Sequence, residues 1–313
     1  MATARRVLIT GWFSFLHGEA TAGDVLAAEA VAAALDRAGT QHDTAWSPVL
    51  RPHALHLDQA DPGRYRALVF VCGPLHSLPP ADGVRSPLLE LHERFRALRR
   101  IAVGVSVPDP EDPAATGFDL VIGRDGPGLA APRPDLAALA PEPGRVPVVG
   151  VVRVAAQGEY GERSRHDKVD AVLDDWLTGL DAALLPLDTR LDPHDWRLPR
   201  APAQLEAAVG RLDAVVTTRL HGLVLAVRAG VPALAVDPVA GGAKVAAQAR
   251  ALDWPAVLTA EHAVPQELGP WWHWCLSGAG RARAAATRDR LRTPEAGEAL
   301  AALVAEVRRP IGG

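Results

Sequence analysis

The chain has 313 residues, which is enough for two domains of about 150 residues each. Hydrophobic residues make up 48% and charged residues 22%, a balance that is typical of a folded globular protein and argues against disorder. The 33 basic and 37 acidic side chains give a formal net charge of −4, which removes the usual electrostatic reason to expect a nucleic-acid-binding protein.

The two cysteines indicate neither a metal site nor a disulfide framework. Cys72 and Cys275 lie far apart, and no CxxC or Cys/His spacing accompanies them. Because Cys72 follows an apolar run, we expect it to be a small buried hydrophobic side chain.

The amino-terminal apolar run is too short for a signal peptide. It covers residues 7–10 and stops at Gly11, so a first β-strand is the better interpretation. No uninterrupted apolar stretch of about 20 residues occurs, and we therefore expect a cytoplasmic protein without a transmembrane segment.

Short apolar runs alternate with longer helical patterns, which predicts parallel sheets with crossover helices. The clearest helix is expected over 22–38, because this segment is Ala-rich and Gly39 follows it as a C-cap. In chain order, strands are predicted at 7–10, 68–71, 101–105, 120–122, 148–152, 184–187, 214–217 and 233–236, and further helices at 88–99, 167–182, 202–209, 223–229, 281–291 and 294–308.

This order of elements predicts an α/β protein with two Rossmann-like domains that face a central ligand cleft. The stretch 126–147 is rich in Pro and Gly and marks a boundary, which gives domains over 1–140 and 146–313. We expect the carboxyl-terminal helices to pack back on the first domain. Trp271, Trp272 and Trp274 are expected to pack between the domains. The oligomeric state is not predicted.

The most informative segment is 213–232, in which a buried strand, a turn and a helix follow one another. The strand ends at Thr217, the turn carries Arg219 and His221, and the helix begins near Gly222. Free N–H groups and the helix dipole favour an anion at such a turn, and Gly222 would let the backbone approach a ligand closely. We therefore predict a phosphate or carboxylate site. The alternative is that Arg219 pairs with a carboxylate and His221 is an interior residue.

The same region carries a family resemblance. Residues 217–237, TTRLHGLVLAVRAGVPALAVD, with Lys244 after them, resemble the carboxyl-terminal signature of the polysaccharide pyruvyltransferase family. Three weaker resemblances follow the order of the family: a Gly-rich loop ending in Gly-Asp at 18–24, a strand with a Gly-rich turn at 69–75, and a strand ending in arginine at 149–153. Together they extend over nearly the whole chain.

The resemblance implies a GT-B-like fold and a transferase that moves a pyruvyl group from phosphoenolpyruvate to hydroxyls of a sugar, forming a ketal. It implies that the first domain serves the acceptor and the second the donor. It requires no metal and no cofactor, since phosphoenolpyruvate is the donor substrate. The acceptor is a sugar, a glycan or a glycosylated small molecule. Its identity is not predicted, because the first domain departs from the family pattern. There the Gly-rich turn is reduced to Cys72-Gly-Pro-Leu75, and the first loop carries Trp12, Phe13, Phe15 and His17.

The donor has a carboxylate and a phosphate, so its site needs about two or three cationic groups. Arg153, Arg219 and Lys244 are the candidates that the resemblance places there, with Gly222 beside them.

Catalysis requires a proton donor to the methylene carbon and assistance to the sugar hydroxyl. His221 is the predicted general acid. Asp24 is the predicted residue that assists the hydroxyl, although a capping role at the helix that follows it stays open. Gly73 is assigned to substrate binding.

Two other functions stay open on the same architecture. One is a glycosyltransferase with a nucleotide-sugar donor, for which no ribose-binding acid is identified. The other is a non-catalytic sugar-binding relative. The combination of Arg153, Arg219, His221 and Lys244 argues against it, because a binding protein needs no proton donor beside an anion site. An NAD-dependent enzyme is disfavoured, since no GxGxxG follows the first strand.

Overall fold

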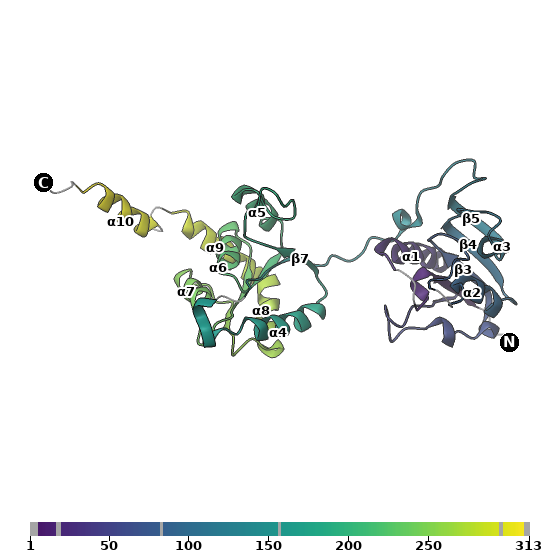
Figure 1. Cartoon of the computed structure of the whole chain (residues 1–313), viewed down its shortest axis with the longest axis horizontal. Helices are drawn as coiled ribbons and strands as arrows, with labels where there is room; N and C mark the ends of the chain where they lie inside the picture. Colours follow the sequence, from purple (N-terminus) through teal and green to yellow (C-terminus); the bar gives the residue numbers. More distant parts are fainter. Residues whose placement is uncertain (1–5, 17–19, 82–83, 156–157, 294–296, 310–313) are drawn as a thin grey trace. The chain divides into compact units, whose positions relative to one another are not determined.

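The computed structural model describes residues 6–16, 20–81, 84–155, 158–293 and 297–309. The chain divides into two compact units, Met1–Pro143 and Gly144–Gly313. This division falls within the stretch 126–147, whose Pro and Gly residues continue neither helix nor strand. Each unit is an α/β structure with a parallel sheet of its own (Figure 1).

The first unit contains a five-stranded parallel sheet in the order β2-β1-β3-β4-β5. The order reverses at β1, so the switch point lies between β1 and β3, where sheets of this kind bind ligands beyond the carboxyl ends of their strands. The elements are β1 (Arg6–Gly11), α1 (Ala22–Arg37), β2 (His42–Thr44), β3 (Tyr65–Val71), α2 (Pro87–Arg94), β4 (Arg99–Ser106), α3 (Pro113–Thr116) and β5 (Leu120–Asp125), with 3-10 turns at Trp12–Ser14, Leu57–Gln59, Pro62–Arg64 and Leu136–Leu139.

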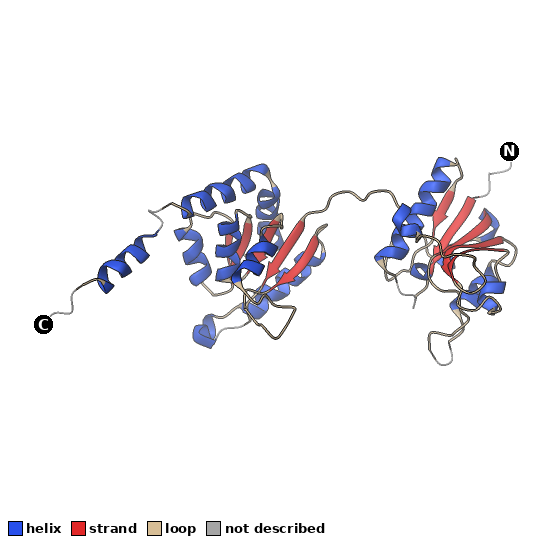
Figure 2. Ribbon diagram, turned by 90° about the horizontal axis from the view of Figure 1, so that it is seen from above, coloured by secondary structure: helices blue, strands red, loops and turns tan. Residues whose placement is uncertain are grey.

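The side-chain alternation of β1 explains why both faces of this sheet are covered. Val7 and Ile9 belong to one apolar cluster, together with Ala27 of α1. Leu8 points to the opposite face and belongs to a second cluster, together with Leu88 of α2. Helices therefore lie on both sides of the sheet (Figure 2).

The second unit repeats the same pattern with strand order β10-β9-β8-β6-β7, again all parallel. Its switch point lies between β6 and β8. The elements are β6 (Val148–Val152), a 3-10 segment (Gly158–Arg163), α4 (His166–Thr178), β7 (Ala183–Leu187), α5 (Pro202–Val209), β8 (Ala214–Thr217), α6 (Leu220–Ala229), β9 (Ala233–Asp237), α7 (Lys244–Ala251), β10 (Val257–Thr259), α8 (Pro265–Leu276), α9 (Gly278–Leu291) and α10 (Glu298–Val307).

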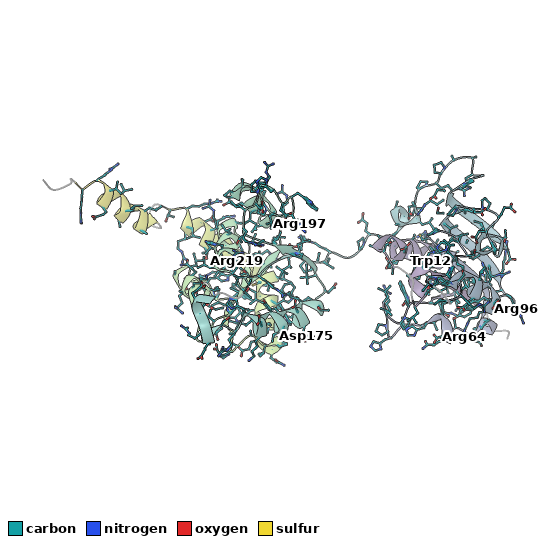
Figure 3. All side chains as sticks on the ribbon, viewed as in Figure 1. Trp12, Arg64, Arg96, Asp175, Arg197 and Arg219 are labelled. Atoms are coloured by element: carbon teal, nitrogen blue, oxygen red, sulfur yellow. The ribbon has the colours of Figure 1, made fainter. Side chains whose placement is uncertain are left out.

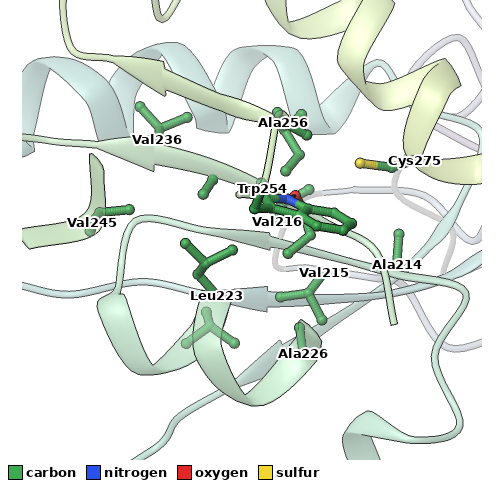
Figure 4. Close-up of a cluster of buried hydrophobic side chains, with 14 of the residues drawn as sticks. Ala214, Val215, Val216, Leu223, Ala226, Val236, Val245, Trp254, Ala256 and Cys275 are labelled. Carbon is green, nitrogen blue, oxygen red and sulfur yellow. Dashed lines mark hydrogen bonds between the residues drawn. The ribbon is translucent and has the colours of Figure 1, made fainter. Parts of the chain in front are cut away.

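The core of the second unit surrounds β8 and β9, which are buried along their whole length, as expected for central parallel strands. Figure 4 shows Val215 and Val216 of β8 with Leu223 of α6 in this cluster. The indole of Trp254 is buried there too, and its Nε1 donates to the Ala233 carbonyl at 2.7 Å. The polar atom of this large side chain is thereby satisfied inside an apolar core.

The tryptophans of α8 pack on this same core. Trp272 lies edge-on to Trp176 of α4, with ring centroids 5.8 Å apart. Trp274 lies edge-on to Trp254 at 5.5 Å and to Trp271 at 5.7 Å. These ring contacts all lie within the second unit, and the packing of Trp271, Trp272 and Trp274 between the domains stays a prediction.

Several elements differ from the predicted ones. The edge strands β2 and β10 were not predicted, because each has three residues and neither stands out as an apolar run. Helix α2 ends at Arg94 rather than 99, and β4 already begins at Arg99. Helix α9 packs against α6 and α8 of its own unit. Among the described residues, no helix has both the length and the apolar character needed to cross a membrane.

Candidate active site

The residues predicted to bind the donor gather at the carboxyl-terminal edge of the second sheet. Arg153 follows β6, Arg219 and His221 follow β8, and Lys244 begins α7 after β9. Neighbouring strands in a sheet are about 5 Å apart. Because β8 lies between β6 and β9, these residues start from adjacent strand ends. The site includes the switch point of this sheet, which is where ligands of such folds bind.

Two consecutive threonines join the ends of β6 and β8 through hydrogen bonds of their hydroxyl groups. The hydroxyl of Thr217 donates to the Val152 carbonyl at 2.9 Å, and the hydroxyl of Thr218 accepts from the Val154 amide at 3.1 Å. Both threonines are buried. Neither threonine was predicted to have a role, although two hydroxyl residues at the end of an apolar strand were a usable signal. They fix the backbone from which Arg219 projects.

Gly222 has a packing role within the protein, and its approach to a ligand stays a prediction. It is buried in the first turn of α6, and a Cβ there would lie 2.1 Å from Oγ1 of Thr217 and 3.1 Å from Cβ of Val152. The missing side chain therefore lets α6 approach the ends of β6 and β8. The close contact is therefore between Gly222 and the ends of these two strands.

Replacing Gly222 with alanine is therefore expected to destabilise the second unit by about 1–3 kcal/mol, the usual cost of overpacking. Chemical denaturation measures this. Gly269→Ala in α8 is the matched control, because a Cβ there meets no atom within 4 Å. The control should be neutral or stabilising by about 1 kcal/mol, since alanine favours a helix over glycine. Equal stability of the two variants would contradict the packing role.

The amino terminus of α6 is available to an anion, whereas that of α7 is occupied. Helix α6 has Arg219 at its N-cap position, and no side chain of the described residues caps it. At α7 the buried carboxylate of Asp237 accepts from the amides of Ala243 at 2.7 Å and Ala246 at 2.8 Å. The chain thus fills the second helix terminus with a carboxylate of its own. An external anion is favoured at α6.

The guanidinium of Arg219 lies across the end of β6. Its Nη1 is 2.8 Å from Oδ1 of Asp188, which follows β7, and β6 separates β7 from β8 in the sheet. Burial raises the pKa of Asp188. Hydrogen bonds from Arg190 and the charges of Arg190 and Arg219 outweigh it and hold this pKa below its ordinary value. The carboxylate pairing left open from the sequence is thus present. Arg219 is labelled in Figure 3.

Arg153 is held by two carboxylates on one face of α4. Its Nη2 is 2.7 Å from Oδ1 of Asp174, and its Nη1 is 3.9 Å from Oδ1 of Asp170. These acids are four residues apart, so they occupy successive turns of the helix. Burial raises the pKa of Asp170. Lys244 has a looser partner, with Nζ 3.8 Å from Oε1 of Glu159. All three predicted cations therefore face acids of the chain itself.

His221 and His166 both lie at this edge of the sheet, near its switch point. His221 is exposed in the first turn of α6, which leaves its ring accessible, and it is not the interior residue of the alternative interpretation. His166 was not predicted. It begins α4, is only 2% exposed and has Nδ1 2.8 Å from the hydroxyl of Ser164. Its Nε2 is buried without a hydrogen-bond partner among the described residues. Its position after the loop that follows β6 was the signal in the sequence.

Comparison with known families supports the resemblance seen in the sequence. Residues 133–238 match the family model of polysaccharide pyruvyl transferase. We call this stretch the family segment. It covers less than half of the chain and includes β6 to β9 with Arg153, Arg219, His221 and Gly222, whereas Lys244 lies beyond it.

Solved structures with similarity include several glycosyltransferases. Spinosyn forosaminyltransferase SpnP is 16% identical over 97% of this chain and 100% of its own, with a TM-score of 0.34. The glycotransferase of kitacinnamycin is 14% identical over 93% and 96%, with a TM-score of 0.32. SnogD from Streptomyces nogalater is 16% identical over 97% and 100%, with a TM-score of 0.31. Among curated proteins, no similar sequence was found.

Asp24 lies outside the family segment, in the first unit, and closes a capping box. Its Oδ2 accepts from the backbone amide of Thr21 at 3.0 Å and from the Thr21 hydroxyl at 2.8 Å, while the Asp24 amide donates to that hydroxyl. Thr21 is the N-cap, so Asp24 has the helix-capping role that the sequence left open, at the third helical position. Of the preceding loop, His17, Gly18 and Glu19 lie outside the described residues.

Gly73 lies against an aromatic side chain, and its assignment to substrate binding stays a prediction. A Cβ at Gly73 would lie 2.1 Å from Cδ1 of Trp12, so the missing side chain makes room for the indole. Trp12 also stacks on His76 at 4.8 Å and donates to the Pro74 carbonyl at 3.0 Å. Trp12 is labelled in Figure 3. The indole occupies the switch point of the first sheet, between the ends of β1 and β3.

Proposed function

We propose that the chain is a transferase that moves a pyruvyl group from phosphoenolpyruvate to two hydroxyls of a sugar-containing acceptor and forms a ketal. The observation that carries the proposal is the turn after β8. There an uncapped helix terminus, the Arg219 guanidinium and the exposed His221 ring meet within the family segment. This combination suits a small anion that must also receive a proton.

The donor-binding role is compatible with the ion pairs described above. A guanidinium has five N–H donors, and a single contact to Asp188 or Asp174 leaves donors for a ligand. Asp188 and Asp174 also fix the direction of the two arginines before the donor arrives, which reduces the entropy lost on binding. The amide groups of α6 provide the remaining donors for the phosphate or the carboxylate.

The chemistry assigned to His221 is protonation of the methylene carbon, which becomes a methyl group and leaves the neighbouring carbon electrophilic. One sugar hydroxyl adds to that carbon. A second hydroxyl then replaces the phosphate, and the carbon–oxygen bond to phosphate breaks. Of the two hydroxyl protons, one balances the proton gained by the methyl group and the other leaves with the phosphate. Asp24 remains the predicted residue that assists a hydroxyl.

Phosphoenolpyruvate at about 100 times its Kd is expected to raise the free energy of unfolding of the unit that binds it by about 2.7 kcal/mol. Thermal unfolding followed with and without the ligand measures this shift. A nucleotide sugar is the control and should give no shift. Stabilisation by the nucleotide sugar, with none by phosphoenolpyruvate, would contradict the proposal and favour a glycosyltransferase.

A further inference from the structure

The first unit contains a pocket of about 440 Å³ on the loop side of its sheet. Its walls come from helix α2 and from the segments that follow β1, β2 and β3, the three neighbouring strands at the switch point. This volume lies within the range of small-molecule sites, which is about 300–1,000 Å³. The location is the side of a parallel sheet on which ligands bind.

Apolar side chains form both the floor and the mouth of this pocket. Leu91 of α2 and Phe95, which follows α2, are buried at its floor, and Phe15 is buried beside them. At the mouth, Leu16 is 56% exposed and Val84 is 42% exposed. Exposed apolar groups that continue into a buried apolar floor are typical of a site that receives an apolar group.

The cations around the pocket are already engaged. Arg94 donates to the backbone carbonyls of Asp58 at 2.7 Å and Ala60 at 3.2 Å. Arg85 pairs with Glu93 at 2.8 Å. Glu93 thus neutralises Arg85, whereas Arg94 keeps its charge and stands against the carboxylates of Asp58 and Glu90 in the pocket lining.

The carboxylates at the rim differ from the arginines in their contacts. The side chains of Asp58 and Glu90 line the pocket and form no hydrogen bond or ion pair with other described residues. Carboxylates of this kind accept hydrogen bonds from hydroxyl groups and repel anions. The pocket thus combines an apolar interior with acceptors for hydroxyls at its edge.

We propose that this pocket binds the apolar aglycone of an uncharged glycoside, with sugar hydroxyls at the Asp58 and Glu90 rim. The ligand is the acceptor of the transferase, a step that rests on the proposed function. The charge pattern favours a glycosylated small molecule over a sugar linked to a lipid phosphate, since the carboxylates at the rim repel a phosphate.

Titration calorimetry on the full chain tests this without phosphoenolpyruvate. The probes are methyl, butyl and octyl glucosides below their micelle concentrations, with phenyl glucoside as an aromatic aglycone. Each methylene that becomes buried should tighten binding roughly fourfold. We therefore expect octyl glucoside to bind at least about tenfold more tightly than methyl glucoside, given a few buried methylenes. Binding of octyl or phenyl glucoside that is tighter than binding of methyl glucoside supports the proposal. The order of affinity between octyl and phenyl glucoside then distinguishes an alkyl aglycone from an aromatic one.

Val84→Asp is expected to remove the gain from chain length. Leu78→Asp is the matched control, because Leu78 is 67% exposed in the same loop between β3 and α2 and does not line the pocket. Affinity that is independent of chain length would overturn the proposal. So would farnesyl phosphate binding that exceeds octyl glucoside binding and is weakened by Val84→Asp. Neither result depends on pyruvyl transfer, so this inference and the proposed function can fail separately.

Discussion

Replacing His221 with alanine is expected to lower kcat for pyruvyl transfer by about 10²–10⁴-fold, the usual contribution of a positioned general acid. The ring is exposed at the beginning of α6, so its removal leaves no cavity and should change stability by less than about 0.5 kcal/mol. Phosphoenolpyruvate should still bind, because the helix terminus and Arg219 are unchanged. Release of phosphate in the presence of an acceptor measures the turnover.

The control for this variant is His194→Ala, since His194 is also exposed but lies in the loop after β7, away from the switch point. Full turnover in His221→Ala would remove the assigned role. If turnover is instead lost in His166→Ala with the fold retained, the proton donor is the buried histidine at the start of α4.

Replacing Arg219 with lysine is expected to weaken phosphoenolpyruvate binding by about 10–100-fold. Lysine keeps the charge, but it loses the planar pair of donors, and each charge-assisted hydrogen bond is worth about 1.5–3 kcal/mol. The ammonium can still pair with Asp188, so the acid is not left isolated. Titration calorimetry with phosphoenolpyruvate measures the change in Kd.

Arg228→Lys provides the matched control on the same helix. Arg228 pairs with Glu206 at 2.8 Å, as Arg219 does with Asp188, but it lies in the last turn of α6. Its replacement changes an ion pair of similar length at the carboxyl-terminal end of α6, where the helix dipole repels anions. We expect no change in Kd for phosphoenolpyruvate. Equal affinities of the two variants would exclude Arg219 from the donor site.

The central strands were the most predictable part of the fold. β6 and β8 have the predicted bounds, because each is a short apolar run between residues that interrupt strands. The short edge strands β2 and β10 could not be found in the same way. β2, for example, reads His-Asp-Thr and is stabilised by pairing with β1 rather than by burial. The start of α9 at Gly278 was also missed, because Ser277 caps it although glycines follow.

The site was predictable as far as strand ends determine it. A parallel sheet brings Arg153, Arg219 and Lys244 to one edge whatever the loops do. Their acidic partners come from distant positions, such as Asp188, which lies 31 residues from Arg219, and no local pattern indicates such a pair. The glycines show the same limit. Gly73 and Gly222 were recognised as special, but only the neighbouring Trp12 and Thr217 reveal that the space serves packing.

The separate apolar clusters of the two units affect how ligand effects on this chain must be measured. One cluster contains residues of the second unit, and the other two contain residues of the first. Multi-domain chains do not in general unfold in a single two-state equilibrium, so one melting temperature does not define the stability of this chain. Calorimetric traces should be resolved into component transitions. Under the two proposals above, phosphoenolpyruvate should shift the transition of the second unit and the glycoside that of the first.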